Sequence, residues 1–136
     1  MDKVIDYILK ERFSEDSLIA IATVDNCGTP WVRTVDAIYI DGAFYTITHN
    51  STNKMKHISD NPLVGICGEW FSGHGKAESL GYICNEENNG IAYKLRKAFA
   101  SWYDNGHTNE NDINTIILKI TVVDGVIYKD GKRFEF

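Results

Sequence analysis

The first apolar residues of the chain recur at helical spacing. They fall on one face of a short amphipathic helix and comprise Val4, Ile5, Ile8 and Leu9. The polar segment from Ser14 to Ser17 ends this helix. The next segment, Leu18 to Val24, is a continuous apolar run that is too short for a typical helix, so it predicts a buried strand.

Two further strands are predicted around a tight turn. The segment from Asp25 to Pro30 has the composition of a turn, and Trp31 to Ile40 resumes as a strand rich in β-branched and aromatic residues. Asp41-Gly42 is a strong hairpin signal. We therefore expect the chain to return as a strand from Ala43 to Thr48.

The middle of the chain predicts a short helix between strands. Residues His49 to Asn53 offer capping side chains, and Lys54 to Ser59 has a helical pattern that Asn61-Pro62 ends. Leu63 to Trp70 then has the pattern of a strand. A bend at Phe71 to Gly73 would lead into a further strand from His74 to Cys84.

A second amphipathic helix follows Asn88-Asn89 and is expected to end at Asn105-Gly106. Its apolar face comprises Ile91, Leu95, Ala98, Phe99 and Trp102. The remaining residues predict a strand from Thr115 to Val123, a tight hairpin at Asp124-Gly125 and a returning strand from Val126 to Lys129. Asp130-Gly131 is a further turn signal of the same kind before the C-terminal tail.

These elements predict a mainly β fold with helices in the connections. About six meandering antiparallel strands favour a closed or nearly closed barrel, because closure removes the exposed edges of a sheet. The chain has 136 residues and shows neither a linker nor an internal repeat, so we expect residues 1–136 to form a single domain.

Composition and charge limit the kinds of partner. The net charge of −5 does not favour nucleic acid, and any phosphate would have to be bound by a local cluster of donors. No apolar run approaches the roughly 20 residues of a membrane span. Acidic residues stand where a signal peptide would be basic, so we expect a cytoplasmic protein without a membrane partner. The three cysteines lack CxxC spacing, so no disulfide framework or metal site is expected.

Common nucleotide and hydrolase motifs are absent from the sequence, which contains no GxGxxG, GxxxxGK[ST] or GxSxG. The candidate chemistry lies instead around one hairpin and the helix after it. Arg33 interrupts an apolar strand, where an unpaired buried charge would be costly, so it is either a surface residue or a ligand contact. Ser51, Thr52 and Lys54 at the start of the short helix form either an ordinary cap or an anion site.

Taken in order, these segments resemble the FMN-binding split-barrel superfamily, the pyridoxamine 5′-phosphate oxidase-like proteins. The resemblance runs from Leu18 to Gly81. Its marks are Gly28-Thr29-Pro30 before Val32 to Val35, then Phe44-Tyr45-Thr46, Lys54, Asn61 to Val64, and Gly75 to Glu78.

The resemblance implies an antiparallel six-stranded split barrel that binds FMN as a homodimer. It implies that the strand beginning at Arg33 lines the flavin, and that the ribityl phosphate is bound after the next strand. It also implies that Trp70 of one subunit covers the flavin ring of the other. The cofactor-binding residues implied in this way are Arg33, Thr34, Val35, Tyr45, Thr46, Ser51, Thr52, Lys54 and Trp70.

Two departures set this chain apart from the oxidase itself. Ile38 stands where the oxidase has a basic residue for the substrate phosphate, and Trp70 stands where it has a flavin-contacting Gln. The C-terminal tail has no clear match either. We therefore expect an FMN-dependent oxidoreductase that passes electrons from NAD(P)H to a small acceptor, and not a true pyridoxamine 5′-phosphate oxidase.

Three alternatives stay open at the level of the sequence. They are a nitroreductase of the nitroimidazole-resistance type, a non-catalytic flavin- or haem-binding module, and an enzyme that uses the deazaflavin F420. The sequence assigns no catalytic residue. His74 is either a proton donor near the flavin or a surface residue.

Overall fold

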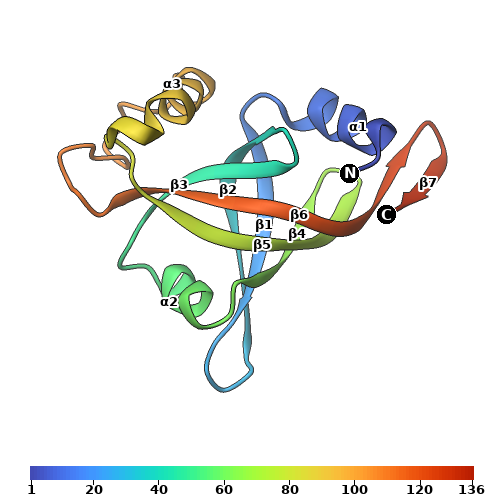
Figure 1. Ribbon diagram of the computed structural model, residues 1–136, viewed down its shortest axis with the longest axis horizontal. Coiled ribbons are helices and arrows are strands. Elements are labelled where there is room, and N and C mark those ends of the chain that lie inside the picture. Colours follow the sequence, from blue (N-terminus) through green and yellow to red (C-terminus); the bar gives the residue numbers. More distant parts are fainter.

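The computed structural model describes residues 1–136 as a curved sheet with helices at its ends (Figure 1). The helices are α1 (Lys3–Phe13), α2 (Asn53–Asp60) and α3 (Asn89–Ala98), the last preceded by a 3-10 turn, Glu86–Asn88. The strands are β1 (Ser17–Val24), β2 (Pro30–Ile40), β3 (Ala43–His49), β4 (Leu63–Gly68), β5 (Phe71–Tyr82), β6 (Thr115–Lys129) and β7 (Lys132–Glu135). None of the helices is long and apolar enough to cross a membrane.

The sheet closes on itself through its longest strand. The strand order is β3-β2-β1-β4-β5-β6-β7, and an additional pairing of β3 with β6 completes a six-stranded antiparallel barrel. β7 extends β6 as a short hairpin outside the closed part. The prediction of a mainly β, antiparallel six-stranded barrel with helices in the connections is confirmed.

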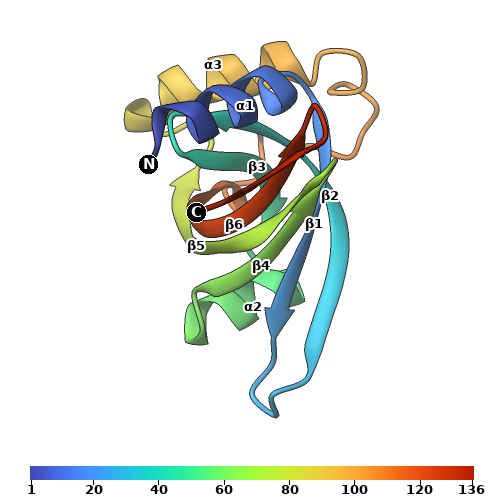
Figure 2. The same ribbon diagram turned by 90° about the vertical axis from the view of Figure 1, so that its right-hand side faces the viewer.

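Inward-pointing apolar side chains alternate along the strands and fill the barrel, and a helix lies at each of its two ends. Ile19 and Ile21 of β1 and Phe44 of β3 point inward, and each is at most 1 % exposed. Figure 2 shows α1 over one end of the barrel and α2 at the other, beside the long β1–β2 hairpin. Both helices contribute apolar residues to this core, whereas α3 covers a second cluster on the outer surface.

The prediction of a hairpin at Asp124-Gly125 is wrong. β6 runs without interruption from Thr115 to Lys129, and Asp124 lies opposite His74 of β5 at an irregularity in the register. A Cβ atom on Gly125 would lie 2.8 Å from the carbonyl oxygen of Ser72. Gly125 therefore allows two strands to approach closely, and it does not reverse the chain.

Two other boundaries differ from the sequence expectation. The bend falls at Glu69-Trp70, before Phe71, and Trp70 itself adopts a φ of 53°. The third helix ends at Ala98, well before Asn105-Gly106. Phe99 and Trp102 are stacked with their ring centroids 4.9 Å apart, and the indole N–H of Trp102 donates to Asp16. The hydrogen bond to Asp16 is a tertiary contact, and residues 99–107 form turns where the apolar spacing alone favoured a helix.

The close approach of β5 and β6 predicts a strong effect of a single methyl group. A Cβ atom on Gly73 would lie 2.2 Å from the carbonyl oxygen of Asp124, so Gly73→Ala should lower the free energy of unfolding by roughly 1–3 kcal/mol. Gly90→Ala in α3 is the control, because a Cβ there meets nothing within 4 Å. Urea unfolding of both variants measures the difference, and equal stability of the two would contradict this account of the strand crossing.

Candidate functional site

Arg33 lies on the inner face of β2, at the end of the barrel nearest α2. Its Nη1 donates to the carbonyl oxygen of Ile21 at 3.2 Å and to Oγ1 of Thr23 at 2.7 Å. Burial lowers the pKa of the guanidinium. Arg33 forms no ion pair in the structure, and its Nε and Nη2 make no hydrogen bond. The guanidinium therefore keeps donors free beside the end of the barrel.

Lys54 is the second cation at this end of the barrel. Oγ1 of Thr52 accepts from the N–H of Met55 and caps α2, which brings Lys54 into the first turn of the helix. The Lys54 side chain is 8 % exposed, and its Nζ donates to Oγ1 of Thr48 at 2.9 Å. Burial, helped by the charge of Arg33, lowers the pKa of Lys54 to about 8. No carboxylate forms an ion pair with either cation.

The barrel is open beside these two cations. β2 pairs with β1 from Pro30 to Ala37, but it pairs with β3 only from Ile38 to Ile40. The outer edge of β2 from Arg33 to Asp36 therefore lacks a partner strand. A hydrogen bond spans this opening, in which the Thr46 hydroxyl donates to the carbonyl oxygen of Asp36 at 2.7 Å. An extended ligand could meet unpaired backbone groups here.

The sequence did not reveal the hydrogen-bonded group of His49, Ser51 and Asp112 near the start of α2. Nδ1 of His49 lies 2.7 Å from the Ser51 hydroxyl, and Nε2 lies 2.8 Å from a carboxylate oxygen of Asp112. The Ser51 hydroxyl is thus already engaged within the protein. Asp112 lies far from His49 in the sequence, in the loop before β6, so no local spacing could reveal the pair.

The remaining predicted residues do not all converge on this site. Thr34 is exposed on the face of β2 opposite to Arg33, while Val35 points inward and packs against the core. Tyr45 is 8 % exposed and lies in the apolar cluster under α3, away from the two cations. The structure therefore brings together Arg33, Lys54 and the start of α2, and leaves the Tyr45 side chain outside.

Trp70 lies at the opposite end of β4 from α2. β4 begins at Leu63 directly after α2 and ends at Gly68, so its length, about 20 Å at the usual rise per residue, separates Trp70 from Lys54. Trp70 is 69 % exposed, and its indole packs edge-on against Tyr128. Trp70 cannot reach the two cations of its own chain.

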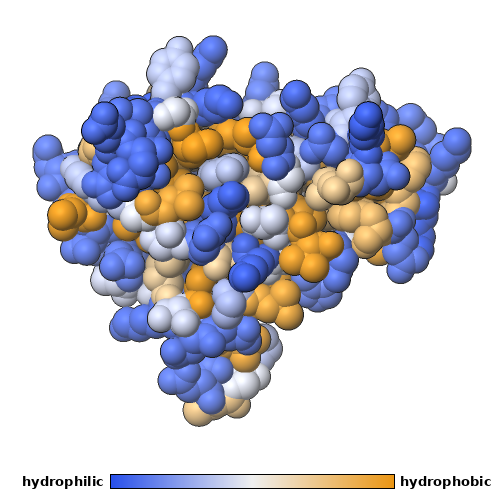
Figure 3. All heavy atoms as spheres, in the orientation of Figure 1, coloured by the Kyte–Doolittle hydropathy of each residue, from blue (hydrophilic) through white to orange (hydrophobic).

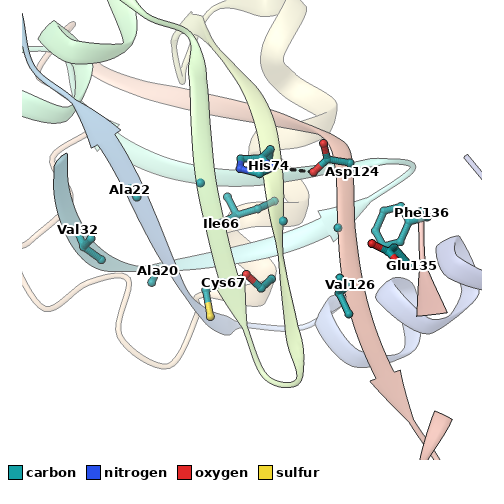
Figure 4. A pocket seen from close by; sticks show the side chains of 14 residues that line it. Ala20, Ala22, Val32, Ile66, Cys67, His74, Asp124, Val126, Glu135 and Phe136 are labelled. Carbon is teal, nitrogen blue, oxygen red and sulfur yellow. Dashed lines mark hydrogen bonds and ion pairs between the residues drawn. The ribbon is translucent and has the colours of Figure 1, made fainter. Parts of the chain in front are cut away.

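A broad pocket of about 700 Å³ lies on the outer surface of β1, β4, β5 and β6 (Figure 4). Its walls are mostly small or apolar side chains, among them Ala20, Ala22 and Val32. Figure 4 shows His74 and Asp124 facing each other at one side of the pocket, with Nδ1 of His74 2.7 Å from the carboxylate. His74 is thus half-exposed and hydrogen-bonded to Asp124, on a face separate from Arg33 and Lys54.

An antiparallel barrel in which β2 and β3 pair over only three positions, with helices at its two ends, is a split barrel. The sequence profile of the family described as pyridoxamine 5′-phosphate oxidase matches residues 6–126. The chain therefore belongs to the pyridoxamine 5′-phosphate oxidase family.

Individual relatives are distant in sequence. The pyridoxine/pyridoxamine 5′-phosphate oxidase of Blochmanniella floridana is 27% identical over 107 residues, which cover 76% of this chain but only 45% of that enzyme. The chain thus spans less than half the length of this curated relative.

Three solved structures share the fold. A nimc/nima family protein from Clostridium acetobutylicum superimposes with a TM-score of 0.69 at 19% identity, covering 98% of this chain and 94% of that one. A FAD-binding protein from Mesorhizobium loti gives 0.69 at 13% identity, with 92% of each chain covered. A haem binding protein from Mycobacterium smegmatis gives 0.69 at 14% identity, covering 100% of this chain and 58% of that one.

Because Lys54 is a buried cation, we expect its removal to stabilise the ligand-free protein. Because the folded-state pKa of Lys54 is about 8, below its ordinary value, charging Lys54 opposes folding at every pH below about 8. Lys54→Met should therefore raise the melting temperature of the ligand-free protein at pH 7. The gain should shrink as the pH rises from the folded-state pKa toward the ordinary lysine pKa of about 10.4, and it should vanish only above that pH, where Lys54 is neutral in both states.

Lys56→Met is the matched control, because Lys56 is exposed on the same helix. Thermal unfolding between pH 6 and 10.5 measures both variants. A destabilised Lys54→Met variant at pH 7 would show that the Lys54–Thr48 hydrogen bond outweighs the desolvation of the ammonium group.

Proposed function

We propose that this chain binds a flavin nucleotide, FMN, with its phosphate held by Arg33 and Lys54. The observation that carries the proposal is the pair of neighbouring, partly desolvated cations that no acidic side chain neutralises. Two such like charges are unfavourable together unless an anion joins them. A phosphate dianion supplies that anion.

The donors at the site suit a phosphate ester. Nε and Nη2 of Arg33 offer the paired N–H groups that bind phosphate oxygens bidentately, and Lys54 adds a compact charge. The first amides of α2 and the hydroxyls of Ser51 and Thr52 lie at a helix N-terminus, where anions are favoured. Ser51 would exchange its bond to His49 for one to the phosphate. The flavin ring would then follow the unpaired edge of β2 from Arg33 to Asp36.

We also propose an oxidoreductase function, with NAD(P)H as electron donor and a small molecule as acceptor. Flavin supplies the redox chemistry when bound, and the chain supplies binding and orientation. The position of Ile38 supports a substrate other than pyridoxamine phosphate, because Ile38 is 2 % exposed and packs beneath α3. No side chain of this chain is assigned a catalytic role, and the cytoplasmic location stays a prediction.

A homodimer is part of this proposal. The outer face of β1, β2 and β4 carries uncovered apolar side chains, and exposed patches of this kind often mark interfaces. They comprise Leu18, Ala20, Ala22, Val32 and Leu63, and they adjoin the pocket of Figure 4. In the view of Figure 3, apolar patches also lie among polar ones across the barrel.

Trp70 supports the same arrangement. Its positive φ is unusual for a bulky residue, and Arg12 fixes the turn by donating to the carbonyl oxygens of Glu69, Trp70 and Tyr128. A turn held in this way presents the indole to solvent, out of reach of its own Lys54. In a dimer, the indole would be free to cover the flavin of the partner.

The haem-binding structure supports a test of the cofactor itself. The absorbance spectrum of freshly purified protein distinguishes flavin, deazaflavin and haem. A haem spectrum without flavin would contradict the proposed cofactor.

The phosphate site predicts a preference for FMN over riboflavin, with about one FMN per chain. Lys54→Met should weaken FMN binding about 10- to 150-fold, because a hydrogen bond to a charged group contributes roughly 1.5–3 kcal/mol. Riboflavin binding should not change. Fluorescence quenching titrations measure both affinities, with Lys56→Met as the control that keeps the wild-type preference.

The same titration has a defined pH dependence. Lys54 must be protonated to bind phosphate with its full charge, so FMN affinity should fall as the pH rises above about 8. Riboflavin affinity should not fall over the same pH range. Equal affinity of the wild-type protein for FMN and riboflavin would exclude the phosphate site.

The apolar outer face predicts a dimer near twice the 15.4 kDa chain mass in dilute solution. Val32→Glu should shift this dimer toward monomer, because it places a charge on this apolar face, where Val32 is 68 % exposed. Ile113→Glu is the control, since Ile113 is 70 % exposed in the loop before β6. Light scattering after gel filtration measures the mass. A wild-type monomer that binds FMN fully would contradict the shared site.

A further inference from the structure

Thr23 lies at the centre of a hydrogen-bonded chain behind the two cations. It is a polar residue on the inner face of β1 and is 0 % exposed. Its Oγ1 accepts from Nη1 of Arg33 at 2.7 Å and lies 2.8 Å from Nδ1 of His57 on α2. One buried hydroxyl thus contacts both β2 and α2.

One bond of this chain has a fixed direction. A guanidinium only donates, so Oγ1 of Thr23 is the acceptor of the bond from Arg33. The hydroxyl keeps a proton and a second lone pair, so it can form a further hydrogen bond with Nδ1 of His57 at the same time.

The other bonds of Arg33 do not fix its orientation equally well. The distances from Nη1 to the carbonyl oxygens of Ile21 and Trp31 are 3.2 and 3.4 Å, against 2.7 Å to Thr23. The hydroxyl of Thr23 is thus the closest partner of the guanidinium. With Nη1 held there, Nε and Nη2 remain available to a ligand.

His57 connects the same chain to the helix that carries Lys54. The two residues are three positions apart on α2, so their side chains lie on neighbouring parts of one helix surface. The ring of His57 also packs against Trp31, with centroids 6.3 Å apart, and the indole N–H of Trp31 donates to Asp25 at 3.0 Å. The end of the β1–β2 hairpin is therefore attached to α2 at this point.

We propose that Thr23 is a positioning residue that determines phosphate specificity by holding Arg33 in register with Lys54. This inference rests on the proposed binding of a flavin phosphate. Thr23 does not touch the ligand. It orients the guanidinium from one side and ties α2 to the hairpin from the other, so the two cations keep one separation.

The test compares Thr23→Val, which keeps the shape of the side chain and removes the hydroxyl, with Thr23→Ser, which keeps the hydroxyl. Thr23→Val should reduce FMN affinity about 5- to 30-fold, less than the loss of a direct contact to the phosphate, because Thr23 acts only through Arg33. Riboflavin affinity should stay at the wild-type value. Thr23→Ser should restore the FMN preference to within about twofold of wild type.

A spectroscopic readout separates positioning from general stability. In long-range ¹H–¹⁵N spectra, the Nδ1 resonance of His57 should shift in Thr23→Val but not in Thr23→Ser. His57→Phe keeps an aromatic ring against Trp31 and removes the ring nitrogen that contacts Thr23. It should lower FMN affinity without lowering riboflavin affinity, which keeps the inference testable if Thr23→Val does not fold.

The outcomes distinguish this inference from the function on which it rests. If wild-type protein prefers FMN and Thr23→Val keeps that preference, the positioning role is wrong and the phosphate site stands. If Thr23→Val weakens FMN and riboflavin equally, Thr23 has only a structural role and the inference is overturned. If the wild-type protein shows no preference for FMN, the proposed phosphate site itself fails.

Discussion

The pairing of β6 with both β3 and β5 is the constraint on which the rest of the structure depends. By joining the ends of the sheet, it creates an interior that α1 and α2 close from opposite ends. It also draws β3 toward β6, so β3 leaves β2 after three paired positions, Ile38 to Ile40. The open edge of β2 is thus a consequence of barrel closure.

Two cations face this opening, and their electrostatics give the site its character. Burial lowers the pKa of both Arg33 and Lys54, and the charge of Arg33 lowers that of Lys54 further, while no acidic side chain forms an ion pair with either group. Such an arrangement opposes folding and favours an anion. Stability and the proposed function therefore act in opposite directions at Lys54.

The outer surface of the barrel has a different chemistry. Small and apolar residues of β1, β2 and β4 surround the pocket that holds His74 and Asp124, while Trp70 projects from the β4–β5 turn. Within one chain this surface is remote from the two cations. In the proposed dimer, a second copy of the chain would bring the two kinds of surface together, so the proposed cofactor site and the proposed dimer are one hypothesis.

The sequence by itself determined the positions of β1 to β5, the first two helices and the local candidates Arg33, Thr52 and Lys54, because alternation, turn residues and caps act over a few positions. It could not distinguish a turn from a close strand crossing at Asp124-Gly125, since the role of that glycine depends on Ser72 across the sheet. It also could not place Tyr45 under α3 or connect Thr23 to Arg33 and His57. Only the tertiary structure decided these points, because each is a contact between strands and helices whose register is set by closure of the barrel.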